Sequence, residues 1–268
     1  MVLVHAAGSE GGDSRAVAWW LVRDVLAPLL DLPGVADAAE AARIALGRAH
    51  RHRGNLRGWP VSAAESAVRG ARSSSMLDGG GSQLDAASGS QDPVLAGALR
   101  VGQVLEGGTS GLIGVWQRAP LQALAKLHSL AAADLVAADT LGRPRAQPEV
   151  VARLDLVTRL VTGTTAVPAP VLAGVVHGEL LALAAFGSAD GVVARAVSRL
   201  VTMSTGLDPH GLGVPEVYWL RRAEEYRAAA TGFATGEPDA VGAWLLMSSD
   251  ALADGAREAL SIAEAAAQ

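Results

Sequence analysis

The sequence of 268 residues contains no cysteine, which excludes disulfide bonds, thiolate metal sites and a cysteine nucleophile. Aromatic residues make up only 4% of the chain, and runs of Val, Ile, Tyr and Phe with period-two alternation are nearly absent. Because such runs mark β-strands, their scarcity argues against an extensive sheet. Alanine, which has the highest helix propensity, dominates the apolar residues instead. The composition therefore predicts an all-α helix bundle.

The chain also lacks an uncharged apolar run of the length, about 18 residues or more, that crossing a bilayer requires. Its longest apolar stretch, Val171–Phe186, is interrupted by His177 and Glu179. Residues 1–13 show no basic segment ahead of a long apolar core, so we expect no signal peptide, no membrane partner and a cytoplasmic location. The net charge of −5 argues against a general nucleic-acid binder.

Hydrophobic periodicity and helix-end signals predict a series of helices with short connections. The first three are expected at Ser14–Leu30, Val35–Arg48 and Ser62–Leu77. Glu65 stands three residues after Ser62, and this capping-box pattern favours a helix start there. Further helices are expected at residues 93–106, 119–137, 147–163, 169–185, 189–205, 214–230 and 237–266. Residues 79–92 are rich in Gly and Ser and are expected to form a flexible loop.

A basic cluster lies between the second and third expected helices. It consists of Arg48, His50, Arg51, His52, Arg53 and Arg57. Two interpretations remain open: a solvated helix end whose cations complement the helix dipole, or a site for an anion or an acidic partner. The same region separates an expected N-terminal helical extension, residues 1–57, from a helical domain, residues 58–268, and the two are expected to pack as one compact unit.

Residues 167–206 carry the most specific pattern in the chain. Two prolines open a segment that is apolar on nearly every side, as expected for a helix in the middle of a bundle. A tight loop at residues 186–191 follows, and then a second helix begins. The free N–H groups at the start of that helix form a ready anion site. The pattern therefore predicts a central helix–loop–helix, with Gly187, Gly191 and Arg195 as candidate anion-binding residues.

This segment resembles the Fic family, whose signature has the form H-P-F-x-x-G-N-G-R-x-x-R. Four residues match without a gap: His177 the upstream family His, Phe186 the signature Phe, Gly191 the second Gly and Arg195 the final Arg. Flanking family elements occur in order, at Ser74–Gly79 (S-S-x-I-E-G, with Asp78 for Glu), Leu127–Leu130 (L-H-x-L), Gly142–Arg145 (G-x-x-R), Tyr226 and Trp244. The resemblance covers residues 62–266 and implies a Fic-like all-α bundle.

The departures from the signature fall on the residues that the family uses for chemistry. They are Ala184 for the catalytic His, Ala185 for the Pro, Ser188 for the metal-binding acid, Ala189 for the first Gly, Asp190 for the Asn and Val192 for the first Arg. Family enzymes transfer a nucleotide monophosphate, usually AMP from ATP, to a hydroxyl. Alanine supplies no general base, and a lost cation and an added carboxylate disfavour phosphate. We expect no catalytic residue, no metal site and no cofactor.

Two further expectations come from the resemblance. In the family, the acid of the inhibitory S-x-x-x-E-G element pairs with the final Arg and blocks the γ-phosphate, so we expect an ion pair between Asp78 and Arg195. The family also docks its targets on a β-hairpin flap near the G-x-x-R element. Pro144 and Pro148 lack the N–H that a strand ladder needs, so the flap is expected to be reduced or absent.

The leading hypothesis is therefore a Fic-fold pseudoenzyme that serves as a protein-interaction or regulatory scaffold and binds an unknown protein partner or itself. For such a scaffold, ATP binding is expected to be weak or absent. Three alternatives remain open: a nucleotide or anion sensor that uses Arg195 and residues 187–191, a transferase with altered chemistry, and an ordinary helical protein that carries the motif by chance. His128 and His177, which have apolar neighbours, are expected to be buried core residues.

Overall fold

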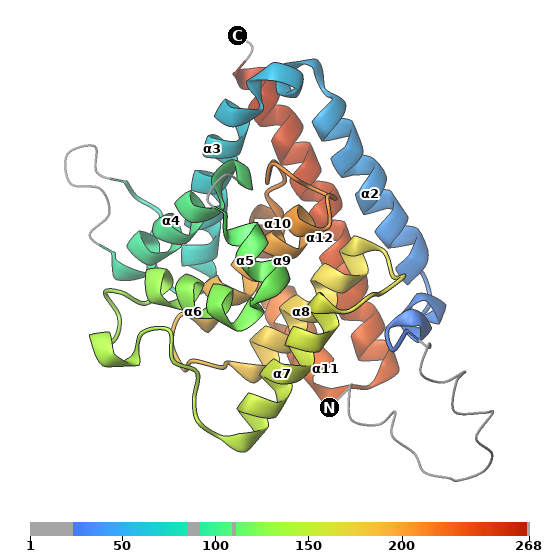
Figure 1. Cartoon of the computed structure of the whole chain (residues 1–268). Coiled ribbons are helices and arrows are strands. Elements are labelled where there is room, and N and C mark those ends of the chain that lie inside the picture. Colours follow the sequence, from blue (N-terminus) through green and yellow to red (C-terminus); the bar gives the residue numbers. More distant parts are fainter. Residues whose placement is uncertain (1–23, 85–91, 109–110, 267–268) are drawn as a thin grey trace.

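A computed structural model describes residues 24–84, 92–108 and 111–266, and these residues form helices and connecting segments without any strand (Figure 1). The longer helices are α2 (Val35–Arg51), α3 (Arg53–Leu77), α4 (Pro93–Leu105), α5 (Leu112–Arg118), α6 (Pro120–Ala131), α7 (Pro148–Thr162), α8 (Ala169–Leu183), α9 (Asp190–Ser204), α10 (Pro215–Arg221), α11 (Ala223–Thr235) and α12 (Pro238–Ala265). Short 3-10 helices lie at Ala27–Asp31, Glu106–Gly108 and Ala138–Thr140. The all-α prediction is confirmed, and residues 138–150, the expected flap region, contain no strand.

Helix α8 lies at the centre of the bundle (Figure 1). All of residues 171–180 are buried, and the helix packs against α9, α12, α11, α7 and α2. A helix that is apolar on every side is stable only when neighbours cover each side. The predicted central helix–loop–helix is therefore α8, the loop of residues 184–189, and α9.

Small residues let the long outer helices approach each other closely. Helix α12 runs beside α2 along most of its length (Figure 1). A second apolar cluster, built mainly from alanines, fills the space between these helices and the start of α3, and consists of Ala42, Leu46, Ala49, Ala63, Leu212, Leu252, Ala256 and Ala259. The division expected between residues 57 and 58 falls inside α3, so α2 is joined to the rest of the bundle by a continuous helix and a shared core.

Large aromatic side chains anchor the core around α8. Trp116, Trp219 and Trp244 are fully buried, and the Trp244 Nε1–H donates to the Gly174 carbonyl oxygen of α8 at 2.8 Å. Trp59 differs, since it is only partly buried and its ring stacks on His210 with 4.0 Å between ring centroids. The other two tryptophans, at positions 19 and 20, lie outside the described residues.

The start of the third helix was predicted wrongly. Helix α3 begins at Arg53 rather than at Ser62, which is buried inside the helix. The N-cap is His52, whose Nδ1 accepts a hydrogen bond from the Gly54 N–H at 3.3 Å, so an imidazole replaces the expected hydroxyl. The helix also continues through Pro60, whose cost is offset by the packing of α3 against α4, α10 and α12.

Other boundaries differ less from the predictions. The helix expected at residues 119–137 ends at Ala131, and α5 lies in the preceding segment, which was expected to be a connection. The helix expected at residues 214–230 is divided into α10 and α11 by Arg222, which has a non-helical backbone. Most of the helix expected at Ser14–Leu30 lies outside the described residues, and its described end contains a short 3-10 helix. Helices α4, α7, α8, α9 and α12 match the predictions closely.

None of the helices that the structure describes is both long enough and apolar enough to cross a lipid bilayer.

The contact between α4 and α6 generates a stability prediction. A Cβ on Gly97 of α4 would lie 2.0 Å from the Ala131 carbonyl oxygen of α6, so the two backbones meet at this glycine. We expect Gly97→Ala to lower the free energy of unfolding by about 3 kcal/mol, because the helices must separate to admit the methyl group. Denaturant unfolding followed by circular dichroism measures this loss.

Gly58 provides the matched control, because a Cβ on this α3 residue would meet nothing within 4 Å. Gly58→Ala is expected to leave stability unchanged or to raise it by up to about 1 kcal/mol through helix propensity. Equal effects of the two substitutions would contradict the close approach of α4 and α6.

Candidate functional site

The candidate site is organised around Arg195 of α9, whose side chain is only 2% exposed. Its Nε donates to Ser74 Oγ at 2.8 Å, and its Nη2 donates to the Ser74 carbonyl oxygen at 3.0 Å and to Asp78 Oδ1 at 2.7 Å. Its Nη1 donates to the Tyr226 hydroxyl at 3.5 Å. Burial by itself would lower the pKa of Arg195, but Tyr226 and Asp78 outweigh it and raise the pKa. A charged Arg195 thus ties α9 to α3 and α11.

The Asp78 carboxylate occupies the N-terminus of α9. One oxygen pairs with Arg195, and the other accepts a hydrogen bond from the Val192 N–H at 3.0 Å. A carboxylate here satisfies a free N–H group of the helix and lies at the positive end of its dipole. The expected ion pair between Asp78 and Arg195 is present, and this chain's own acid fills the anion position that the sequence predicted.

Gly191 provides the room for this carboxylate. A Cβ at position 191 would lie 2.4 Å from Asp78 Oδ1 and 2.6 Å from Oδ2, so any side chain there would displace the acid. Gly79 follows Asp78 with a φ of +83°, the left-handed conformation that commonly terminates a helix. Gly187, also predicted to bind an anion, lies beside the Arg145 side chain.

The loop between α8 and α9 is held from outside by Arg145, the last residue of the G-x-x-R element. The Arg145 N–H donates to the Ala185 carbonyl oxygen, and its Nη2 donates to the Leu183 carbonyl oxygen, each at 2.8 Å. Two alanines in this loop, Ala184 and Ala189, have positive φ values of 43° and 50°, which are uncommon without glycine. Ala184 presents only a methyl group where the resemblance places the catalytic histidine.

Ser188, which the resemblance aligns with the metal-binding acid of the family, is hydrogen-bonded to His128 of α6. The Gly142 N–H donates to His128 Nδ1 at 2.9 Å, so the ring proton is on Nε2, which donates to Ser188 Oγ at 3.0 Å. The Phe186 ring stacks on the imidazole with 4.1 Å between centroids. Because Nε2 is a donor, His128 cannot take the Ser188 proton, and burial further lowers the pKa of His128.

Asp190 begins α9, but its carboxylate turns back into the loop. Its Oδ1 accepts a hydrogen bond from the Phe186 N–H at 2.9 Å. Burial raises the pKa of Asp190. The sequence predicted that Asp190 would repel phosphate at the helix N-terminus, whereas the acid that bonds to the Val192 N–H and to Arg195 is Asp78.

Tyr226 of α11 extends the network into the core. Its hydroxyl accepts from Arg195 and is hydrogen-bonded to His177 Nε2 at 2.9 Å. His177 is fully buried between the rings of Trp219, Tyr226 and Trp244. Burial, and secondarily the charge of Arg195, lowers the pKa of His177 well below 6.5. His177 is therefore a neutral core residue, as expected.

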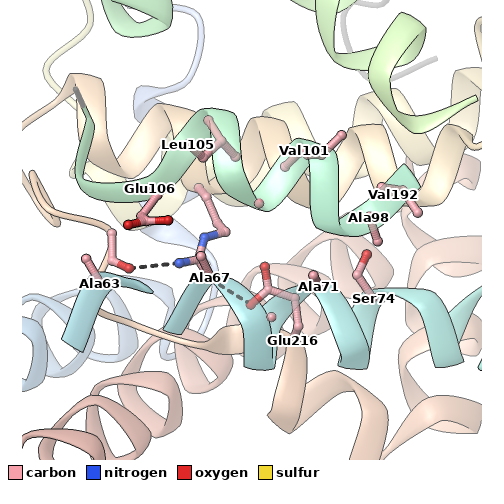
Figure 2. Close-up of a pocket in the computed structure, with 15 residues that line it drawn as sticks. Ala63, Ala67, Ala71, Ser74, Ala98, Val101, Leu105, Glu106, Val192 and Glu216 are labelled. Atoms are coloured by element: carbon pink, nitrogen blue, oxygen red, sulfur yellow. Dashed lines mark hydrogen bonds and ion pairs between the residues drawn. The ribbon is translucent and has the colours of Figure 1, made fainter. Parts of the chain in front are cut away.

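Two spaces adjoin this network. An open cleft of about 390 Å³ lies beside the ion pair and is lined by Asp78, Leu181, Arg195, Tyr226, Arg227 and Thr231, among others. A cavity of about 30 Å³ lies between α3 and α4, with Ser74, Val192 and Glu216 on its wall (Figure 2). The cavity has room for little more than a water molecule. The described residues include no group of three His, Asp or Glu side chains that could hold a metal ion.

The sequence predicted free N–H groups at the start of α9 but not that Val192 would supply the one bonded to Asp78. Two other contributors to the site were not predicted. The hydrogen bond between His128 and Ser188 joins positions 60 residues apart. Arg145 was noticed only as part of the G-x-x-R element, and nothing in that pattern shows that it holds carbonyl groups at the end of α8.

No protein-family model and no curated protein matches this sequence. Among solved structures, the chain is similar to a Fic family protein from Desulfovibrio desulfuricans G20, with a TM-score of 0.63 and 15% sequence identity. The match covers 85% of this chain and 74% of that one. At this identity the likeness shows the fold alone, so the chain has a Fic-like fold.

The buried pair generates a second stability prediction. Asp78→Asn preserves the shape of the side chain but leaves the buried Arg195 without its anion. Since Asp78 is itself partly exposed, at 24%, we expect a loss of about 1–3 kcal/mol, at the low end for a broken buried pair. Asp155→Asn, on the exposed face of α7, is the control and should change the free energy of unfolding by no more than about 0.5 kcal/mol. Equal effects in denaturant unfolding would contradict the ion pair.

The buried His177 predicts a pH dependence. Its pKa is lowered on folding, so the unfolded chain binds the proton more readily and stability falls as the pH drops below about 6.5. The pKa values of His128 and His210 are also lowered, so the wild type contains three such contributions. His177→Gln removes one, and its unfolding free energy should fall less steeply than that of the wild type between about pH 6.5 and 5. Parallel curves for the two proteins would contradict a neutral, buried His177.

Proposed function

We propose that this chain is a catalytically inactive Fic-fold protein that acts as a protein-interaction or regulatory scaffold. The observation that carries the proposal is the position of Asp78, whose two oxygens bond to Arg195 and to the Val192 N–H. A phosphate group would need the same two donors. The chain therefore supplies its own anion at the position where a nucleotide phosphate would be stabilised.

The histidines near the loop support the absence of catalysis. A general base must lie within hydrogen-bond reach of the hydroxyl proton that it removes. His128 Nε2 donates to Ser188, and His177 Nε2 is hydrogen-bonded to Tyr226 inside the core. Position 184, which resembles the catalytic position, holds alanine. Neither buried histidine nor Ala184 supplies a base to a target hydroxyl.

Electrostatics support weak or absent nucleotide binding. Arg195 is the one arginine that the resemblance retains in the signature, and Asp78 already neutralises it. A bound phosphate would have to break two charge-assisted hydrogen bonds, which are stronger than neutral ones. Val192 contributes no cation, and Ser188 contributes a neutral hydroxyl.

A well-packed fold whose anion position is already occupied by Asp78 supports a role in binding other proteins at the surface. The network around Arg195 joins α3, α9 and α11, and it holds the remnants of the site in one arrangement without a ligand. A rigid scaffold presents its outer helices to a partner at little entropic cost. We therefore expect this protein to act by binding another protein.

The cleft beside the ion pair favours a second candidate, a small-molecule sensor. Its volume of about 390 Å³ lies within the range of ligand pockets, and Arg227 offers a cation on its wall. In this case the ligand would contact Arg227 and the apolar wall, and it would reach Arg195 only if Asp78 moved.

Calorimetric titration of ATP, with and without magnesium, tests the proposal on the wild type, Arg195→Ala and Arg227→Ala. We expect no saturable heat at about 1 mM ATP, and no label transfer from ATP to the protein or to added polypeptides. Circular dichroism of each variant checks that the fold is retained.

The contrary outcomes separate the alternatives. Saturable binding that Arg195→Ala abolishes would contradict the closed site and favour a nucleotide sensor. Binding lost only in Arg227→Ala would favour a ligand of the cleft that leaves the ion pair in place. Label transfer by the wild type would contradict the inactive protein outright.

A further inference from the structure

The corner at which α2 ends and α3 begins carries an unusual concentration of unpaired cations. It lies beside the C-terminal end of α12, at the top of Figure 1. Arg48, Arg51, Arg53 and Arg57 make no ion pair with any carboxylate that the structure describes. Of the other exposed arginines in the described residues, Arg43, Arg221 and Arg257 are paired with carboxylates. The remaining ones are unpaired as well, so what sets the corner apart is that four unpaired arginines lie close together between positions 48 and 57. We call these four arginines, together with Leu56 and Val61, the basic corner.

Helix dipoles account for only part of this cluster. Arg48 and Arg51 lie in the last turn of α2, where cations are favourable. Arg53 and Arg57 lie in the first two turns of α3, where the dipole is positive and where the first turn holds no acid. The α12 carbonyl of Ala263 lies near Gly54 and offsets some of this repulsion. The interpretation of a solvated helix end therefore applies to Arg48 and Arg51 at the end of α2, whereas Arg53 and Arg57 belong to the next helix.

Apolar side chains are exposed among these cations. Leu56 is 65% exposed and Val61 is 62% exposed, both unusually high for large aliphatic residues. Arg53, Leu56, Arg57 and Pro60 recur at helical spacing and share one outward face of α3. Pro60 has no N–H to donate to the Leu56 carbonyl oxygen, which leaves a backbone acceptor on that face. The helix dipoles do not account for Arg53 and Arg57 or for the exposed Leu56 and Val61, and all four residues suit an interface.

We propose that the basic corner is the docking surface for an acidic, amphipathic segment of a protein partner. The proposal rests on the interaction function proposed above and names its surface. Arginine guanidinium groups bind carboxylates through paired hydrogen bonds. Leu56 and Val61 cover the apolar side of such a segment, and a mixture of Arg and aliphatic contacts is typical of protein interfaces.

Charge distribution distinguishes this partner from a polyanion. Without the four arginines of the corner, the formal net charge of the chain would be −9 rather than −5. The rest of the surface therefore repels an extended nucleic acid or an anionic membrane, which would approach more than the corner. A short acidic segment contacts the corner alone, and beyond about 8 Å the remaining charge is screened at physiological salt.

Fluorescence anisotropy with a defined probe tests the proposal on the full-length protein. The probe is a labelled amphipathic peptide of Glu, Leu and Ala, and its counterpart has Lys in place of Glu. The Glu peptide should bind, more weakly as salt rises, and the Lys peptide should not. The double variant Arg53→Glu, Arg57→Glu should weaken binding at least about tenfold. The double variant Leu56→Ala, Val61→Ala should weaken it at every salt concentration.

Arg159→Glu is the matched control, because Arg159 is an exposed arginine in the last turn of α7 and lies outside the corner. It should leave the affinity for the Glu peptide unchanged. Equal binding by wild type and corner variants, or no binding of the Glu peptide at about 100 μM, would overturn the proposal. It would also be overturned if single-stranded DNA or phosphatidylserine vesicles bound the corner in preference to the Glu peptide. The corner variants do not touch Arg195, so these outcomes are independent of the ATP titration that tests the scaffold function.

Discussion

The rest of the site depends on one constraint, the burial of the Arg195 charge. A guanidinium group removed from water must be surrounded by acceptors, and here Ser74, Asp78 and Tyr226 supply them from two other helices. The geometry of neighbouring residues follows from this requirement. Gly191 lacks a side chain because the Asp78 carboxylate lies against it, and Tyr226 is positioned to connect the charge with His177 in the core. The same contacts therefore organise the packing of α3, α9 and α11.

The constraint also bears on function, because the acid that neutralises Arg195 takes the anion position of α9. The residues of the loop between α8 and α9 point to the same functional conclusion as this ion pair. Ala184 carries no base, Ser188 is bonded to His128, and Asp190 closes the loop on itself. A polypeptide with this arrangement keeps a Fic-like fold while its donors are already occupied. We infer that it acts through its surface, where the basic corner stands apart from an otherwise acidic chain.

Much of the fold could be predicted from the sequence, because apolar periodicity and Pro or Gly at helix ends determine where α4, α7, α8, α9 and α12 lie. The ion pair of Asp78 and Arg195 was predicted from two motif elements. The start of α3 was not, since a histidine cap and a proline within a helix both run against the usual preferences. The bond of Asp78 to the Val192 N–H, and the inward turn of Asp190, depend on main-chain geometry that side-chain identities do not encode. Contacts between distant positions, such as His128 with Ser188, required the fold itself.

The most direct test of the closed anion site is an NMR titration of the isotopically labelled wild-type protein with magnesium pyrophosphate. The two reporters are the Val192 amide and the Arg195 Nε–H, which donate to Asp78 and to Ser74. On titration, neither signal should shift in the wild type, because both donors are already bonded within the chain. In Asp78→Ala, where the acceptor of the Val192 N–H is missing, the Val192 signal should shift as magnesium pyrophosphate is added. Saturable shifts of both signals in the wild type would contradict the account, because they would show that an external phosphate displaces Asp78.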